Sequence, residues 1–342
     1  MNTGLPAISV HGLVKRYGRT TALDGVDLSV ASGSVVGVLG PNGSGKTTLV
    51  RVLATLMRYD EGDVRVAGYD VAKQAQQVRS RIGLVGQYAA LDERLTAREN
   101  LMMFARLYRL NRAEARAGTE ELLRRFDLEY AADRVVKTYS GGMRRRLDLA
   151  ASLLVSPEVL FLDEPTTGLD PKSRREIWGM VRTLAVEGTT ILMTTQYLDE
   201  ADQLADQIVV LDSGTVIAEG TPGELKDWAG GERLEVVVPE FEDLHDTASA
   251  IGGVSNGTVI VKEDERKITI PVRNGIAALA SVVRELDSRS VAADDIVLRR
   301  PTLDDAFSEL TESRRRLEDK KGSADKQAIR DTFNFRTGNR GA

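Results

Sequence analysis

The segment Gly40–Thr48 reads Gly-Pro-Asn-Gly-Ser-Gly-Lys-Thr-Thr and directly follows the apolar run Val35–Leu39. It fits the pattern G-x-x-x-x-G-K-[ST], in which glycines let the backbone turn its N–H groups toward phosphate oxygens. The apolar run predicts a buried strand, and a helix that starts near Gly45 would add positive charge at its N-terminus. A strand, a loop and a helix in this order predict an α/β domain that binds a nucleoside triphosphate.

Two residues of this loop have predicted chemical roles. Lys46 would reach the β- and γ-phosphates, and Thr47 would offer its hydroxyl to Mg²⁺. Contacts to the nucleotide are expected from Gly40, Asn42, Gly43, Gly45, Lys46, Thr47 and Thr48. The alternative interpretation is an ordinary glycine-rich turn between a strand and a helix.

The composition excludes several classes of protein. A length of 342 residues exceeds one typical domain, and a hydrophobic content of 42% is enough for two packed units. The absence of cysteine removes disulfides and thiolate metal sites. We see neither a secretion signal nor an apolar stretch of about 18 residues, so we expect a cytoplasmic chain without its own membrane span. The net charge of -5 argues against a general nucleic-acid-binding surface.

Short apolar runs alternate with helical stretches from Ala7 to Ile217, which predicts a P-loop NTPase core with a mostly parallel sheet. Between about residues 90 and 157, apolar residues recur at helical spacing instead, which predicts an inserted helical subdomain. We expect this first domain to span residues 1–228. Its informative strands are apolar almost throughout, as buried parallel strands are: Val35–Leu39, Ile82–Val85, Val159–Leu162 and Thr190–Met193.

A smaller second domain is predicted for residues 229–311, after a linker at Ala229-Gly230-Gly231. Its expected elements follow a β-α-β-β-α-β order, typical of a ferredoxin-like α+β fold. They are strand 234–238, helix 242–251, strands 258–261 and 267–272, helix 276–286 and strand 295–299. Thr302 and Asp305 then match a capping box and predict a short helix.

The remaining segment, residues 312–342, has few apolar residues. It carries 9 Lys and Arg against 5 Asp and Glu, a difference of +4. This composition predicts a basic tail without fixed structure. A solvated tail is one interpretation, and contact with an anionic membrane surface or a partner protein is the other.

The run Val159–Leu162 ends in the paired carboxylates Asp163 and Glu164. Asp163 is placed to hold Mg²⁺ through its water shell, and Glu164 could polarise an attacking water. The alternative is two acidic residues that only solvate a strand end. That alternative is weakened by the phosphate loop expected in the same sheet.

Together with Tyr139-Ser140-Gly141-Gly142-Met143, these residues resemble the nucleotide-binding subunits of ABC transporters. The resemblance covers residues 7–225, with further matches in the family's order at Tyr17, Gln87 and Gly168-Leu169-Asp170. It implies ATP and Mg²⁺ as cofactors and ATP hydrolysis as the activity.

The resemblance also implies a role for each matching residue. Ser140, Gly141 and Gly142 would complete the ATP site of a second subunit, so that a dimer, expected to be a homodimer, encloses two ATP molecules. Asp170 would lie at that interface, and Tyr17 would stack on adenine. Gln87 would touch Mg²⁺ and sense the membrane partner. For Tyr17, a half-buried aromatic residue on a hairpin remains the alternative.

One departure from the family pattern concerns catalysis. Gln196 stands where the family usually has histidine, and the two histidines of the chain, His11 and His245, are distant in sequence. Glutamine donates a hydrogen bond but takes no proton. We therefore expect Glu164, Lys46 and Mg²⁺ to support catalysis, with Gln196 positioning the γ-phosphate.

Three successive arginines, Arg144, Arg145 and Arg146, follow the segment Tyr139–Met143, the family's signature. Both a phosphate contact and a solvated helix face are compatible with the sequence. Successive residues point in different directions around a helix, so we expect the solvated face.

Three functions remain open. The resemblance favours an ATPase subunit at the cytoplasmic face of the cell membrane that drives a separate transmembrane permease. Gln196, the second domain and the segment Pro301–Phe307 resemble daunorubicin-resistance-type exporters, which implies export of hydrophobic drugs or lipids. The alternatives are a soluble ABC-type ATPase of translation or DNA repair and a nucleotide-gated assembly module with little turnover.

Overall fold

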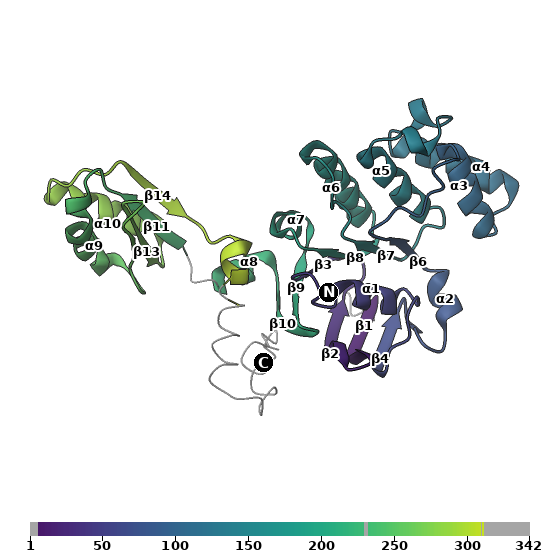
Figure 1. Cartoon of the computed structure of the whole chain (residues 1–342), viewed down its shortest axis with the longest axis horizontal. Coiled ribbons are helices and arrows are strands. Elements are labelled where there is room, and N and C mark those ends of the chain that lie inside the picture. The colour runs from purple at the N-terminus through teal and green to yellow at the C-terminus, as the bar shows by residue number, and fades with distance from the viewer. Residues whose placement is uncertain (1–5, 229–231, 309, 311–342) are drawn as a thin grey trace, which may run out of the picture. The chain divides into compact units, whose positions relative to one another are not determined.

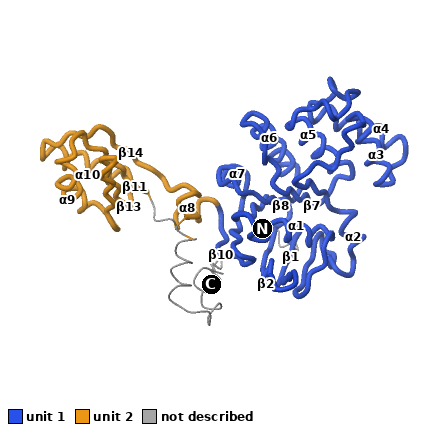
Figure 2. The backbone as a smooth tube through the Cα atoms, in the orientation of Figure 1, with its two compact units in different colours: residues 1–221, 334–342 blue, residues 222–333 orange. Residues whose placement is uncertain are grey.

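The computed structural model of the protein describes residues 6–228, 232–308 and 310. Their contacts divide the chain into two units, the described residues of Met1–Thr221 and those of Pro222–Phe333 (Figure 2). The predicted linker 229–231 and basic tail 312–342 lie outside the described residues.

A six-stranded sheet organises the first unit (Figure 1). Its spatial order is β10 (Thr215–Gly220), β9 (Gln207–Asp212), β3 (Val35–Leu39), β8 (Thr190–Thr195), β7 (Val159–Asp163) and β6 (Ile82–Val85). Every neighbouring pair from β9 to β6 is parallel, and only β10 pairs antiparallel with β9. The predicted mostly parallel sheet is therefore confirmed.

Alternate residues of the central strands pack on opposite sides of this sheet. In β7, Phe161 joins a core shared with α1 (Lys46–Leu53), whereas Leu160 joins a core shared with the helices on the other side. Both faces are covered, which explains the nearly continuous apolar runs.

The first core is closed by a four-stranded antiparallel sheet. Its order is β2 (Thr20–Val30), β1 (Ile8–Tyr17), β4 (Glu61–Val66) and β5 (Tyr69–Asp70), followed in the chain by α2 (Ala75–Arg79). Figure 1 shows this sheet beside α1, on the opposite side of the central strands from α5 and α6.

Helices cover the other face of the central sheet. They are α3 (Ala97–Leu107), α4 (Arg112–Arg125), α5 (Gly141–Ser152), α6 (Pro171–Val186) and α7 (Leu198–Leu204), with short turns η1 (Glu129–Ala131) and η2 (Val136–Thr138). Capping boxes at Thr96 with Glu99 and at Asn111 with Glu114 fix the starts of α3 and α4. As predicted, no strand is assigned between β6 and β7, a stretch that the structure describes throughout.

The second unit contains a separate antiparallel sheet of order β12-β13-β11-β14. Along the chain its elements are α8 (Pro222–Trp228), β11 (Glu232–Val237), η3 (Phe241–Asp243), α9 (Leu244–Ile251), η4 (Gly252–Val254), β12 (Ile260–Lys262), β13 (Lys267–Val272), α10 (Gly275–Ser288) and β14 (Asp295–Arg299). After α8, these strands and α-helices follow the predicted β-α-β-β-α-β order. The predicted capping box is present, because Thr302 Oγ1 accepts from Asp305 N–H at 3.2 Å and Asp305 Oδ2 accepts from Thr302 N–H at 2.9 Å.

Among the described residues, no helix is long and apolar enough to cross a membrane.

Candidate active site

The ends of four parallel strands bring the predicted catalytic segments to one edge of the sheet. Leu39 pairs with Thr195 across β3 and β8, and Asp163 pairs with Thr194 across β7 and β8. β6, which precedes Gln87, pairs with β7 on its other side. Four predicted site segments therefore follow neighbouring strands at the same edge of the sheet: the phosphate loop, Gln196, the Asp163-Glu164 pair and Gln87.

Close packing explains two glycines of the phosphate loop. A Cβ at Gly40 would lie 2.1 Å from Leu211 O, and one at Gly45 would lie 2.5 Å from Ala22 O. Gly45 also has φ +109° where it caps α1, a conformation that favours glycine. Both positions therefore admit no side chain. Asn42 and Gly43 are exposed at the tip of the loop, and Thr48 is half-buried in α1.

Lys46 is 4% exposed and points back along the loop. Its Nζ donates to Gly40 O at 2.8 Å and to Pro41 O at 3.0 Å, and lies 3.9 Å from Glu164 Oε1. Burial lowers the pKa of Lys46, and the neighbouring carboxylates oppose that shift. An ammonium held in this way sits between the loop and Glu164.

The three predicted magnesium ligands converge on one hydroxyl. Thr47 Oγ1 donates to Asp163 Oδ1 at 3.3 Å and accepts from Gln87 Nε2 at 3.5 Å. Hydroxyl, carboxylate and amide oxygens are hard donors that suit Mg²⁺. The described residues hold no group of three or more His, Cys, Asp and Glu able to bind a metal alone. This donor set therefore fits an ion that keeps waters and phosphate oxygens as its other ligands.

Glu164 has a backbone conformation that a glutamate rarely adopts, with φ +49°. Its N–H donates to Thr194 Oγ1 at 3.0 Å, and its Oε2 accepts from Thr167 Oγ1 at 3.2 Å. Strained backbone of this kind persists where the surrounding structure holds it, often at catalytic sites.

Thr194 was missed by the sequence reasoning. Its hydroxyl donates to Asp163 Oδ1 at 2.6 Å and accepts from Glu164 N–H, so it contacts both acidic residues. The signal was a pair of threonines, Thr194 and Thr195, at the end of an otherwise apolar strand.

The signature turn, Ser140–Gly142, lies at the start of α5, and Gly142 is buried. Ser140 is the N-cap, with its Oγ accepting from Met143 N–H at 3.2 Å, and Ser140 and Gly141 are both exposed. Tyr139 is buried, with its hydroxyl donating to Ala131 O at 2.6 Å. No hydrogen bond or ion pair within the described part of the chain joins Ser140, Gly141 or Gly142 to the phosphate loop.

Asp170 caps α6 beside this turn. Its Oδ1 accepts from Lys172 N–H and Ser173 N–H at 3.0 Å, and its Oδ2 accepts from Ser173 Oγ at 2.7 Å. These bonds, the one from Ser173 Oγ first, lower the pKa of Asp170. A Cβ at Gly142 would lie 2.5 Å from Ser173 Oγ, so the signature turn packs directly on the start of α6.

Tyr17 and Gln196, two further predicted site residues, are both exposed. Tyr17, at the end of β1, is 46% exposed, and its hydroxyl donates to Met57 Sδ at 2.7 Å. Gln196 is exposed directly after β8. Its side chain makes no hydrogen bond with the residues that the structure describes.

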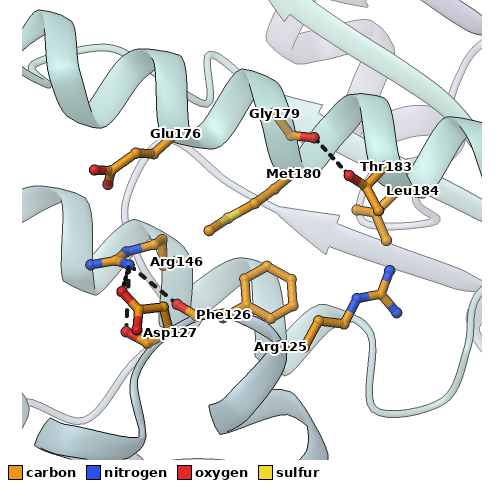
Figure 3. A pocket seen from close by; sticks show the side chains of 9 residues that line it. All are labelled: Arg125, Phe126, Asp127, Arg146, Glu176, Gly179, Met180, Thr183 and Leu184. Atoms are coloured by element: carbon orange, nitrogen blue, oxygen red, sulfur yellow. Dashed lines mark hydrogen bonds and ion pairs between the residues drawn. The ribbon is translucent and has the colours of Figure 1, made fainter.

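The expectation that Arg144, Arg145 and Arg146 form a solvated face is wrong for two of them. Arg145 and Arg146 are 8% and 9% exposed. Arg146 Nη1 donates to Phe126 O at 3.3 Å and to Asp127 Oδ2 at 3.4 Å, beside a cleft of about 370 Å³ between α6 and the end of α4 (Figure 3). Buried backbone carbonyls need hydrogen-bond donors, and the bonds that the two guanidinium groups donate to them offset the loss of water around these cations.

Glu200 is another buried charged residue that the sequence did not predict. Glu200, on α7, is fully buried, and its Oε1 accepts from Thr166 Oγ1 at 2.8 Å and from Trp178 Nε1 at 3.0 Å. Burial raises the pKa of Glu200. It connects the segment after Glu164 with α6 and α7.

Comparisons with known proteins show the family to which the chain is similar. Residues 23–167 match the family model described as ABC transporter. The chain is 56% identical over 313 residues to a daunorubicin resistance ATP-binding protein of Streptomyces coeruleorubidus, covering 92% of this chain and 98% of that protein. It is 49% identical to the daunorubicin/doxorubicin resistance ATP-binding protein of Streptomyces peucetius, over 89% of this chain and 92% of that one.

Solved structures share this fold over 63–66% of the chain. An ATP-binding subunit of an ABC transporter superposes with a TM-score of 0.59 at 29% identity, covering 66% of this chain and 93% of its own. A dimeric ATP-binding cassette bound to ADP and phosphate superposes with a TM-score of 0.57 at 28% identity, covering 63% of this chain and 98% of its own.

Proposed function

The chain belongs to the ATP-binding proteins of ABC transporters, and from this membership we propose that it drives a separate membrane permease that exports hydrophobic drugs or lipids. The protein is an ABC-type ATPase. The observation that supports the site is that Asp163 and Glu164 contact the loop that begins at Gly40, Asp163 through Thr47 and Glu164 through Lys46. The names of the relatives, a daunorubicin resistance ATP-binding protein and a daunorubicin/doxorubicin resistance ATP-binding protein, support the class of cargo.

In the proposed reaction, this chain's residues bind, orient and activate. Lys46 exchanges its loop carbonyl partners for β- and γ-phosphate oxygens. Gln196 orients the γ-phosphate. Glu164, next to the Lys46 ammonium, accepts a proton from the water that attacks the γ-phosphorus, while the bond to the β–γ bridging oxygen breaks and ADP leaves. Mg²⁺, held by Thr47, Asp163 and Gln87, would neutralise developing charge on the phosphate oxygens.

We propose that two copies assemble around two ATP molecules, each bound by the phosphate loop of one copy and the Ser140–Gly142 turn of the other. The support is that Ser140 and Gly141 are exposed at a helix N-terminus. Asp170, which caps the neighbouring helix, would lie in the same interface. Tyr17 would stack on adenine at a point where it is half-exposed.

The proposed location is the cytoplasmic face of the cell membrane, bound to the permease, with no nucleic acid as partner. We further propose a ferredoxin-like second domain at residues 229–311, after an ATPase domain at 1–228, in line with the strand order β12-β13-β11-β14. We propose a structural or regulatory role for that domain.

The proposal is tested with membranes that contain the full chain. The chain should co-purify with a membrane-spanning subunit, and vesicles holding both should accumulate daunorubicin only with ATP and Mg²⁺. Lys46→Ala should abolish accumulation and turnover together. Recovery of ribosomes or DNA instead of a membrane protein would reject the transport function.

A further inference from the structure

Arg145 contacts two segments that both carry predicted site residues. It lies on α5, five residues after the cap Ser140, and its guanidinium is buried. Its Nε donates to Pro165 O at 2.5 Å, its Nη2 to Glu164 O at 2.8 Å and its Nη1 to Gly86 O at 2.5 Å. One side chain thus holds the backbone at Glu164 and the backbone that precedes Gln87.

Asp148 completes this contact one helical turn further on. Its Oδ2 lies 3.5 Å from Arg145 Nη1, and its Oδ1 accepts from Ala90 N–H at 3.1 Å. Gly86 and Ala90 bracket the segment that contains Gln87. The two side chains therefore hold this segment at both ends.

We propose that Arg145 and Asp148 form a positioning pair that keeps Gln87 and Glu164 in one fixed relation to the signature turn. The roles of Gln87 and Glu164 are part of the proposed function, so this proposal rests on that function. All three parts are joined through α5, a 12-residue helix that begins at the turn itself. A displacement of the turn by a second subunit would reach Gln87 and Glu164 through these side chains.

The chemistry of the site requires arginine. A planar guanidinium offers donors in several directions at once, whereas a lysine ammonium is a compact point on a flexible stem. A buried cation is costly unless many partners satisfy it. Here backbone carbonyls from two segments and one carboxylate do so.

The first measurement is hydrogen exchange of the peptide that covers residues 86–91 in the full chain. Asp148→Ala removes the acceptor of Ala90 N–H and should raise its exchange rate by about tenfold or more, equivalent to ~1.4 kcal/mol or more of lost protection. Asp148→Asn keeps an acceptor and should change it much less. This readout does not depend on ATP hydrolysis, so it separates failure of the pair from failure of the proposed function.

The second measurement is ATP turnover and ATP affinity of purified full-length variants. Arg145→Lys and Arg145→Gln should lower kcat by about tenfold to a hundredfold, because a misplacement of about 1 Å can cost up to about a hundredfold. Their affinity for ATP should stay within about twofold, because the pair does not touch the phosphate loop.

The control is Arg146→Lys. Arg146 is also a buried arginine of α5, but it contacts Phe126 and Asp127 instead. The Arg146→Lys variant should lower thermal stability to an extent similar to Arg145→Lys while leaving kcat and the exchange of 86–91 unchanged. Equal kcat losses in the two variants would assign Arg145 a merely structural role and overturn the proposal. So would unchanged exchange in Asp148→Ala.

Discussion

Thr194 Oγ1 donates a hydrogen bond of 2.6 Å to Asp163 Oδ1, within the sheet and away from solvent. The two residues are paired across β8 and β7. The same hydroxyl accepts from Glu164 N–H. One threonine therefore orients the proposed magnesium ligand and supports the backbone of the proposed catalytic base.

Thr194→Val should remove this support without changing the size of the side chain. We expect a loss of about 1.5–3 kcal/mol in the free energy of unfolding, typical of a hydrogen bond to a charged group, together with slower ATP turnover. Denaturant titration and an ATPase assay would measure both. Thr190→Val is the control, because Thr190 Oγ1 accepts from Gly33 N–H at the other end of the same strand. It should reduce stability and leave turnover intact.

Glu164→Gln should trap a dimer with bound ATP, since the carboxylate that accepts the proton is gone while the phosphate contacts remain. Size-exclusion chromatography with ATP and Mg²⁺ would show the dimer. Undiminished multiple turnover by this variant would remove Glu164 as the catalytic base.

The φ of +49° at Glu164 predicts a second effect at this position. Glu164→Gly should be more stable than Glu164→Ala by about 1 kcal/mol, because glycine adopts this conformation without steric cost. Thermal unfolding of the two inactive variants would measure the difference. A more stable alanine variant would show that the surrounding structure relaxes the backbone.

Gln196→Ala should slow hydrolysis and leave ATP affinity nearly unchanged, because Gln196 is exposed after β8 and only orients the γ-phosphate in the proposed reaction. Single-turnover kinetics and equilibrium ATP binding would separate the two quantities. Turnover at the parent rate would exclude Gln196 from the site.

Glu200→Gln should change how stability depends on pH. Burial raises the pKa of Glu200 above its ordinary value of 4.5, so the folded state takes up a proton before the unfolded state as pH falls. The parent should therefore gain stability relative to Glu200→Gln as pH falls through the raised pKa toward 4.5. The slope cannot exceed about 1.4 kcal/mol per pH unit for one proton. Parallel curves for the two proteins would contradict this.

Much of the fold could be predicted from the sequence because its signals are local. The apolar run before Gly40, the loss of strands after β6 and the capping box at Thr302 each reflect short-range preferences. The order of the strands in the sheet was not predicted, because it depends on pairing between segments far apart in the sequence and the connection rules leave several arrangements open.

The buried charged residues could not be predicted in this way. In the sequence Arg145 is one of three successive cations. Its partners at Gly86 and Pro165 are backbone carbonyls far away in sequence, so no local pattern identifies them. Nothing in residue type distinguishes it from Arg144. Glu200 is similar, since its partners Thr166 and Trp178 come together only after α6 packs on the sheet.

The packing of Gly40 and Gly45 affects how genetic screens of this protein should be interpreted. Any larger residue at either position collides with the backbone of β9 or β2, whether or not nucleotide is bound. Alleles at these two positions would lose function through misfolding and low abundance, and in a resistance assay they would resemble nucleotide-binding mutants. Lys46 and Glu164 are therefore the positions where a loss of resistance at normal protein level reports on ATP itself.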